Sequence, residues 1–307
     1  MTGRALQRLN KQMDKILAQE QIKREKKQFG NRALRKMLNN RLSIAGWIIF
    51  AVILLLCIGA PLTAPYDPLQ MDLKNCLSAP SFKHLLGTDK IGRDIFSRIL
   101  YGGRISIFVG LGSALGAALI GVSLGTYSGY KGGLLDTVIF RLSELFMAFP
   151  QMILILLLVS IIGQNLANLI LIFVITGWGS MYRMTRSRIL SLREEEYVQA
   201  MKAFGLHDAV ICFKHILPNA ISPIVVNITL STAMFILQEA ALSFLGLGVP
   251  MEIPTWGNIL NAANDMSVLQ QNWWIWLPVG LVIALFVLSI NFIGDGLRDS
   301  ADPSQQG

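Results

Sequence analysis

The residue types that could carry out chemistry are few in this chain, and their spacing does not assemble a catalytic site. Residues 121–125, GVSLG, have the Gly-x-Ser-x-Gly spacing of a hydrolase nucleophile elbow. That elbow requires a strand–turn–helix setting and a nearby histidine. Here the segment lies inside a long apolar stretch, whereas His84, His207 and His215 lie in polar stretches predicted to be loops. The sequence therefore argues against a serine hydrolase.

Metal and nucleotide chemistry also lack their residues. His207 and His215 are eight residues apart across a glycine, and no cysteine or carboxylate set completes a metal site beside them. The chain contains no GxxxxGK[ST] sequence, the loop that cradles nucleotide phosphates. Cys57, Cys76 and Cys212 imply no disulfide framework. We therefore predict no catalytic residue, no metal site and no cofactor bound by this chain.

The most informative stretch is residues 183–219, the longest charged interruption in the second half of the chain, here called the 183–219 loop. Four residues at helical spacing predict an apolar stripe on a first short helix: Tyr197, Ala200, Met201 and Phe204. Gly205 ends this helix, because glycine adopts a sharp turn at little cost. Asp208 is expected to cap a second short helix that Pro218 ends, and Asn219 to cap the next apolar stretch. Such an exposed helix–turn–helix is typical of a segment that a protein outside the membrane binds.

The elements that position this loop are apolar stretches long enough to cross a bilayer. Of 307 residues, 53% are hydrophobic and 15% charged, and the mean hydropathy is +0.51. These values are typical of an all-α polytopic membrane protein. Six membrane-spanning helices are predicted, over residues 42–60, 105–127, 145–162, 166–181, 220–237 and 273–293. We expect Pro150 to kink the third of them.

Small residues recur every four positions along the second predicted span and just beyond it. In lipid, small side chains at this spacing let two helices approach closely, so we expect a helix–helix contact there. The residues assigned to this contact are Ala117, Gly121, Gly125 and Gly129. In the fifth span, Asn227 and Glu239 are polar groups that are costly in lipid and therefore face a cavity or a partner helix. Asn227 fits an interhelical hydrogen bond, and Glu239 fits an external vestibule or a subunit interface.

Positive charge orients the helices. Twelve Lys and Arg residues precede Leu42, six lie in the 183–219 loop, and none lies in residues 246–272. The positive-inside rule then places the N-terminal tail and the 183–219 loop in the cytoplasm, and six crossings return the C-terminus there. Residues 66–104, with six basic residues, would be external, against the rule. We expect the basic tail to contact anionic lipid and not nucleic acid.

Within this external segment, residues 84–104 predict an amphipathic helix lying on the bilayer surface. Asp89 precedes Arg93 by four residues, and Asp94 precedes Arg98 by four, which predicts two ion pairs along the helix. Asp89 is also the expected cap of this helix. The helix would brace the bundle, and direct contact with a ligand is the alternative.

The 183–219 loop is similar to the EAA motif of ABC-importer permeases, Glu-Ala-Ala followed by Gly and then Ile-x-Leu-Pro. The corresponding segments here are residues 199–201 (QAM), Gly205 and residues 215–218 (HILP), and the departures leave open which side chain makes the polar contact with the ATPase. Four more segments resemble the C-type subunit of the peptide/nickel subfamily, in the same order. They are GTDKIGRDIFSRILYGGRIS, LSFLGLGVP, TWGNIL and NFIGDGLRDSADP, so that the resemblance covers residues 86–303.

The resemblance implies a MetI-like importer core in which the 183–219 loop docks on a cytoplasmic ATPase. The divisions expected are a cytoplasmic tail (1–41), the first span (42–64), an external loop (65–104), the permease core (105–294) and a cytoplasmic tail (295–307). The residues expected to contact the ATPase are Glu195, Glu196, Tyr197, Ala200, Met201, Phe204, Gly205, Leu217 and Pro218. The glutamates could instead form a solvated helix start that the macrodipole favours.

The resemblance also implies partners: a homologous B-type permease subunit, two cytoplasmic ATPase subunits that hold ATP and Mg, and an external binding protein. Asn227 and Glu239 are candidates for a translocation path between the two permeases, and residues 250–258 for the docking surface of the binding protein. ATP-driven closure would switch the spans between inward-open and outward-open states. We expect a multi-pass protein of a bacterial or archaeal plasma membrane that imports di- or oligopeptides, or else nickel chelates or another small solute.

A secondary transporter or channel is the rival class, because it would work without an ATPase. Such a protein predicts paired intramembrane charges or inverted repeats, and the sequence contains neither. A membrane-embedded enzyme would need a convergent nucleophile or metal cluster, which is also absent from the sequence.

Overall fold

The computed structural model describes residues 40–301, and the predicted N-terminal tail lies almost wholly outside them. The described part is helical apart from loops and a single bridge between Thr88 and Asp94. The α-helices are α2 (Arg41–Ile58), α3 (Ala60–Thr63), α4 (Ile95–Lys131), α5 (Gly133–Ala148), α6 (Gln151–Ile162), α7 (Leu166–Leu192), α8 (Glu196–Ala203), α9 (Asp208–Val210), α10 (Leu217–Phe244), α11 (Trp256–Leu260), α12 (Met266–Gln271) and α13 (Trp273–Ala301). Three short helical turns join them, η1 (Leu73–Asn75), η2 (Ile211–Ile216) and η3 (Asn261–Asn264).

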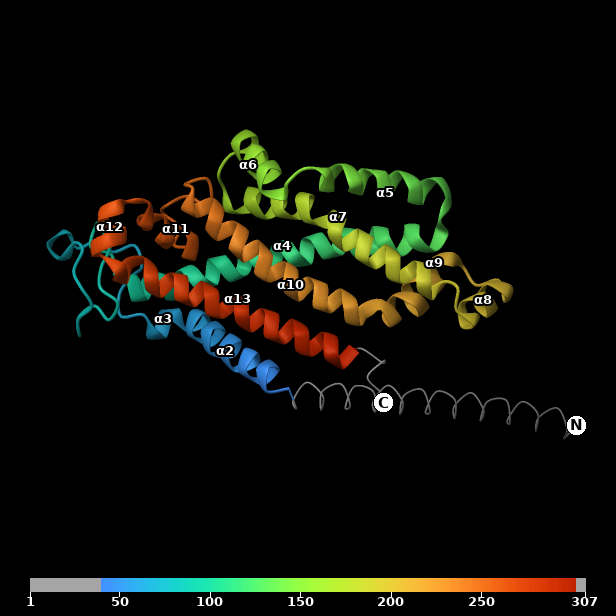
Figure 1. Cartoon of the computed structure of the whole chain (residues 1–307), viewed down its shortest axis with the longest axis horizontal. Coiled ribbons are helices and arrows are strands. Elements are labelled where there is room, and N and C mark those ends of the chain that lie inside the picture. The colour runs from blue at the N-terminus through green and yellow to red at the C-terminus, as the bar shows by residue number, and fades with distance from the viewer. Residues whose placement is uncertain (1–39, 302–307) are drawn as a thin grey trace, which may run out of the picture.

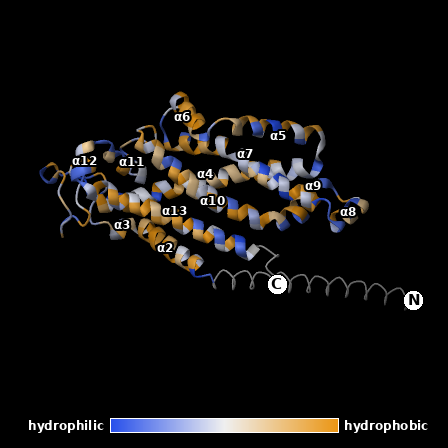
Figure 2. Cartoon of the chain, in the orientation of Figure 1, coloured by the Kyte–Doolittle hydropathy of each residue, from blue (hydrophilic) through white to orange (hydrophobic). Residues whose placement is uncertain are grey.

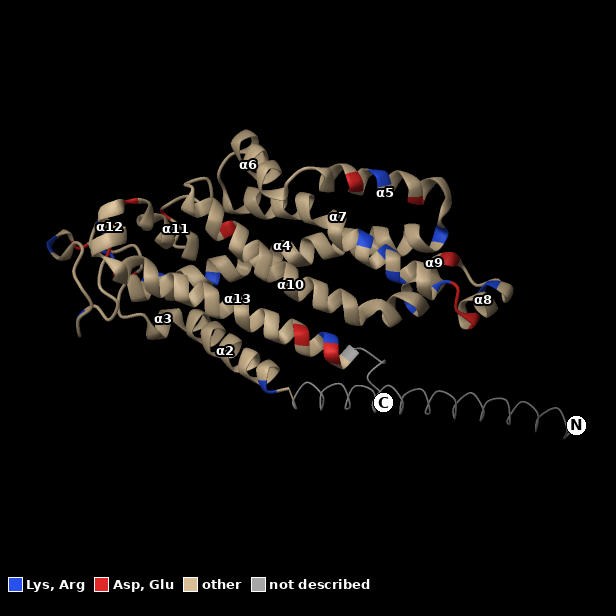
Figure 3. Ribbon diagram, viewed as in Figure 1, with Lys and Arg blue, Asp and Glu red and all other residues tan. Residues whose placement is uncertain are grey.

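The long helices run along one axis of the molecule (Figure 1). Five helices of the described residues are long and apolar enough to cross a membrane, and six cross if a bent pair counts as one span. Apolar residues dominate these helices in Figure 2, and charged residues gather mainly toward the ends of the bundle in Figure 3. The prediction of an all-α polytopic membrane protein is confirmed.

The third predicted span is broken rather than kinked. α5 and α6 meet at an angle of 88° around Phe149 and Pro150. Phe149 is extended, with φ −91° and ψ 141°, because the proline ring disfavours the helical conformation of the residue before it. α5 begins at Gly133, before the predicted span, and its Asp136 accepts two hydrogen bonds from Arg186 of α7, at 2.6 and 2.5 Å. The prediction that Pro150 only kinks a single helix over 145–162 is wrong, because one helix ends at Ala148 and another begins at Gln151.

The prediction of an amphipathic helix over residues 84–104 is also wrong. Its second half is the start of α4, and its first half is a turn. Asp94 caps α4 by accepting a hydrogen bond from the amide of Ser97 at 2.8 Å, so the cap is not Asp89. Asp89 does pair with Arg93, at 2.7 Å, but within the turn. Arg98 is buried and donates to the carbonyl of Pro68, whereas Asp94 pairs with His84.

α4 and α7 pack closely through the small residues of α4. Ala117 is 1% exposed, and a Cβ on Gly121 would lie 2.7 Å from the Trp178 carbonyl oxygen of α7. A Cβ on Gly125 would lie 2.8 Å from the carbonyl oxygen of Tyr182, and one on Gly129 would lie 3.3 Å from that of Arg186. The structure therefore brings the four predicted packing residues to one helix contact, where backbone meets backbone.

α2 and α13 form a second closely packed pair below α10 in Figure 1. Gly46 of α2 lies directly against Ser289 and Phe292 of α13. An apolar cluster joins α2, α4, α10, α11, α12 and α13, and within it the rings of Trp256 and Phe286 are in edge-on contact. The 183–219 loop projects from one end of this bundle, and α11 and α12 lie at the other end (Figure 1).

Candidate functional site

The 183–219 loop is mostly helical. α7 continues to Leu192, α8 follows after a short turn, and α9 begins beyond Gly205. Gly205 has a φ of +73°, in the left-handed region that favours glycine. A Cβ placed there meets no other atom within 4 Å, so the backbone conformation, and not crowding, requires glycine at this turn.

α8 has one face toward the bundle and one toward solvent. Val198 has no exposed surface, and Tyr197 and Met201 are partly buried beside it. Ala200 is exposed, and Phe204 is 84% exposed at the tip of the loop. The cluster that receives the buried face includes Tyr130, Ile189, Ile211, Cys212 and Ile216. The single stripe expected from the sequence is therefore divided between these two faces.

Three consecutive glutamates, residues 194–196, are exposed at the start of α8. Glu195 is the N-cap residue but makes no side-chain capping bond, and Glu194 pairs with Arg193 at 2.9 Å. Carboxylates are stabilised at this end of a helix by the macrodipole. Their exposure suits a contact with basic residues of a partner as well as a solvated helix start.

The second half of the loop differs from expectation. Residues 208–244 form one continuous helical segment, so Pro218 does not end a helix and Asn219 does not cap one. The amide of Leu217 bonds to the carbonyl of Cys212, five residues back, and this wide π turn accommodates the proline that follows. The side chain that caps α9 is His207, not Asp208. Leu217 is partly buried and Pro218 is exposed.

The two polar candidates of the fifth span both lie on α10. Asn227 is half-buried, and its Oδ1 accepts a hydrogen bond from Ser231 of the same helix at 3.2 Å. Glu239 has no exposed surface and accepts hydrogen bonds from Ser106 at 2.9 Å and Ser243 at 2.8 Å. In this conformation, Glu239 faces the inside of the chain and not a vestibule.

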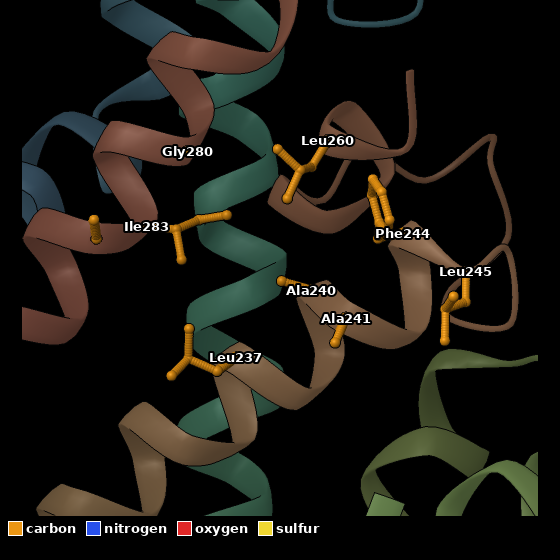
Figure 4. Close-up of a pocket in the computed structure, with 9 residues that line it drawn as sticks. Leu237, Ala240, Ala241, Phe244, Leu245, Leu260, Gly280 and Ile283 are labelled. Carbon is orange, nitrogen blue, oxygen red and sulfur yellow. The ribbon is translucent and has the colours of Figure 1, made fainter. Parts of the chain in front are cut away.

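A cavity of about 570 Å³ lies beside α10, between that helix, α13 and Leu260 (Figure 4). Only apolar side chains and a glycine line it, among them Leu237, Phe244 and Ile283. It has no hydrogen-bond donor or charged side chain that could hold the termini of a peptide, so it does not resemble a peptide-binding site.

In residues 250–258, the expected docking surface of the binding protein, the second half is buried. Thr255 and Trp256 have no exposed surface, and Asn258 is 6% exposed. The side-chain amide of Asn258 donates to three carbonyl groups of its own loop, which fixes the loop conformation. Only Met251 and Glu252 are exposed in residues 250–258. These two residues, with the partly exposed Pro250, Ile253 and Pro254 beside them, are the part of the segment that a partner could reach.

Residues 121–306 match the family model of binding-protein-dependent transport system inner membrane components. The chain belongs to this family. Residues 28–80 match the N-terminal transmembrane domain of oligopeptide transport permease C. The predicted resemblance to ABC-importer permeases and the predicted location, a multi-pass inner membrane protein, are confirmed.

Curated relatives extend over nearly the whole chain. A Brucella suis protein is 43% identical over 272 residues, which cover 89% of this chain and 90% of the relative. The dipeptide transport system permease protein DppC of Alkalihalophilus pseudofirmus is 40% identical, with 89% and 90% covered. The oligopeptide transport system permease protein OppC of Bacillus subtilis is 38% identical, with 92% of each chain covered.

Family membership assigns this chain to the membrane component of the system. It is a transport subunit and not the ATPase. A binding-protein-dependent system implies a binding protein and an ATPase as partners. Among the residues that the structure describes, no group of three His, Cys, Asp or Glu side chains could hold a metal ion.

Proposed function

We propose that this chain is the C-type permease subunit of an importer of di- or oligopeptides, driven through the 183–219 loop by a cytoplasmic ATPase. Relatives named as dipeptide and oligopeptide permeases support the cargo class. The B-type permease subunit would complete the translocation path, and two ATPase subunits would hold ATP and Mg.

The exposed Phe204 is the observation that carries the coupling role. The side chain of Phe204 is 84% exposed at the tip of a projecting turn, where the pocket of a partner could enclose its ring. Ala200 and Gly205, both exposed, leave room around the ring for the wall of a groove. This arrangement is the helix-in-groove mode, in which an apolar anchor enters a partner's pocket.

The test is co-purification of the ATPase with a Phe204→Asp variant. A carboxylate in an apolar groove is unpaired and desolvated, so we expect binding to weaken by about 2–5 kcal/mol and the ATPase to be lost. Phe82→Asp is the matched control, because Phe82 is fully exposed at the opposite end of the protein. Full retention of the ATPase and of uptake in Phe204→Asp would contradict the proposed contact.

The cargo is tested on the binding protein. Mass spectrometry of the ligand that the natively purified binding protein retains should detect peptides. A nickel chelate or another small solute would overturn the cargo while leaving the coupling role intact.

A further inference from the structure

Tyr130, near the cytoplasmic end of α4, contacts both arms of the 183–219 loop. Its hydroxyl donates to Oδ1 of Asp208 at 3.2 Å, and Asp208 is the first residue of α9. The ammonium of Lys202, in the last turn of α8, lies 4.9 Å from the centroid of the Tyr130 ring. One aromatic side chain therefore holds the helix before the Gly205 turn and the helix after it.

The neighbouring backbone strengthens this attachment. Nη1 of Arg193, between α7 and α8, donates to the carbonyl of Gly129 at 3.1 Å. Tyr130 is 5% exposed and belongs to the same apolar cluster as Val198 and Ile211. The loop thus contacts the end of α4 through two hydrogen bonds, a cation–π contact and apolar packing at adjacent residues.

α4 can carry a displacement from this point to the opposite end of the protein. It is one helix of 37 residues, about 55 Å long. Near its outer end, the hydroxyl of Ser106 accepts a hydrogen bond from the amide of Trp256, and the indole of Trp256 donates to the carbonyl of Ile99. The loop that contains Trp256 is therefore hydrogen-bonded to α4, and Tyr130 connects the same helix to the 183–219 loop.

We propose that Tyr130 is the positioning residue that transmits movement of the 183–219 loop to α4 and, through α4, to the outer loop at Trp256. This inference rests on the proposed coupling role of the loop. Phe204 binds the ATPase, and Tyr130 converts the movement of the bound loop into movement of the membrane helices.

The test uses the complete transporter reconstituted in proteoliposomes with its ATPase and binding protein. Tyr130→Phe removes the hydroxyl but keeps the ring beneath Lys202. We expect the ATPase to remain bound and to hydrolyse ATP at the wild-type rate. Peptide uptake per ATP hydrolysed should fall roughly tenfold, as expected for the loss of a hydrogen bond to a carboxylate. Tyr127→Phe, one turn earlier on α4, is the matched control, because the Tyr127 hydroxyl accepts a hydrogen bond from the exposed Lys131 of its own helix and not from the 183–219 loop, within residues 40–301.

A double-mutant cycle separates transmission from general damage. If Tyr130 acts through Asp208, adding Asp208→Asn to Tyr130→Phe should lower the uptake per ATP no further. Additive losses would overturn the inference. Wild-type uptake per ATP in Tyr130→Phe, or a parallel fall in uptake, hydrolysis and protein level, would overturn it as well.

Comparison of the Phe204→Asp and Tyr130→Phe variants distinguishes a failure of this inference from a failure of the proposed function. If Phe204→Asp loses the ATPase while Tyr130→Phe transports normally, only the role of Tyr130 fails. If Phe204→Asp keeps the ATPase and transports normally, the coupling role of the loop fails.

Discussion

At the scale of single residues, contacts between distant segments decide roles that spacing alone cannot assign. Tyr130 and Asp208 are 78 residues apart, and no periodicity in the sequence connects them. Val198 was not predicted to belong to the apolar stripe of α8, although it lies three residues before Met201, a helical spacing. Including it would have identified the buried face of α8. The turn at Gly205, by contrast, was predictable, because a glycine that follows a helical pattern is a local feature.

Glu239 provides a prediction at this scale. Replacing it with leucine leaves the buried hydroxyls of Ser106 and Ser243 without their acceptor, which should cost about 1–3 kcal/mol per orphaned group. We expect a clear fall in the thermal unfolding midpoint of the purified protein, measured by light scattering or tryptophan fluorescence. Glu239→Gln, which keeps the shape and one carbonyl acceptor, should be affected less.

Glu252→Leu serves as the control for Glu239, since Glu252 is exposed on the same side of the protein. If Glu239→Leu unfolds at the same temperature as Glu252→Leu, the buried hydrogen bonds contribute nothing measurable to stability.

At the scale of elements, the spans were predictable and their ends were not. Five of the six predicted spans lie in single helices long enough to cross a membrane, because the bilayer sets their length and hydropathy. The first turns of α4 were assigned to a separate amphipathic helix because Asp89–Arg93 and Asp94–Arg98 have the spacing of ion pairs along one helix, although Arg98 is buried and α4 runs on without interruption. Pro150 was expected to kink one helix. Its effect on Phe149 breaks the span instead, since the preceding residue must be extended.

Alanine substitution at two glycines of α4 should change the stability of the protein in opposite directions, because only one of them lies against α7. Gly112→Ala adds a methyl group where nothing lies within 4 Å, so it should stabilise α4 by roughly 0.5–1 kcal/mol through helix propensity. Gly121→Ala places its methyl group 2.7 Å from the Trp178 carbonyl oxygen and should destabilise the protein by about 1–3 kcal/mol. Unfolding of both variants in the same detergent measures the difference. Equal midpoints would mean that α4 and α7 do not pack as closely as described.

At the scale of the whole molecule, the two ends differ in chemistry. One end presents the 183–219 loop, with its glutamates and Phe204, and the other presents the outer segment before α4 together with α11 and α12 (Figures 1 and 3). The positive-inside rule places the loop end in the cytoplasm, although six basic residues in 66–104 oppose it. Arg98 of this segment is buried in protein, and Arg93 and Lys90 are paired with Asp89 and Asp265, but the rule counts Lys and Arg whatever their partners, so the orientation requires a direct test.

The native cysteines allow this orientation to be tested directly. Cys57 and Cys212 are buried and Cys76, in the outer segment, is exposed, so a membrane-impermeant maleimide should label the wild-type protein in intact cells at Cys76 alone. Cys76→Ser should abolish that labelling. Lys202→Cys in the Cys76→Ser background should then be labelled only after the membrane is permeabilised, because Lys202 lies exposed on α8. Labelling of Lys202→Cys in intact cells would place the loop outside, where no ATPase could reach Phe204.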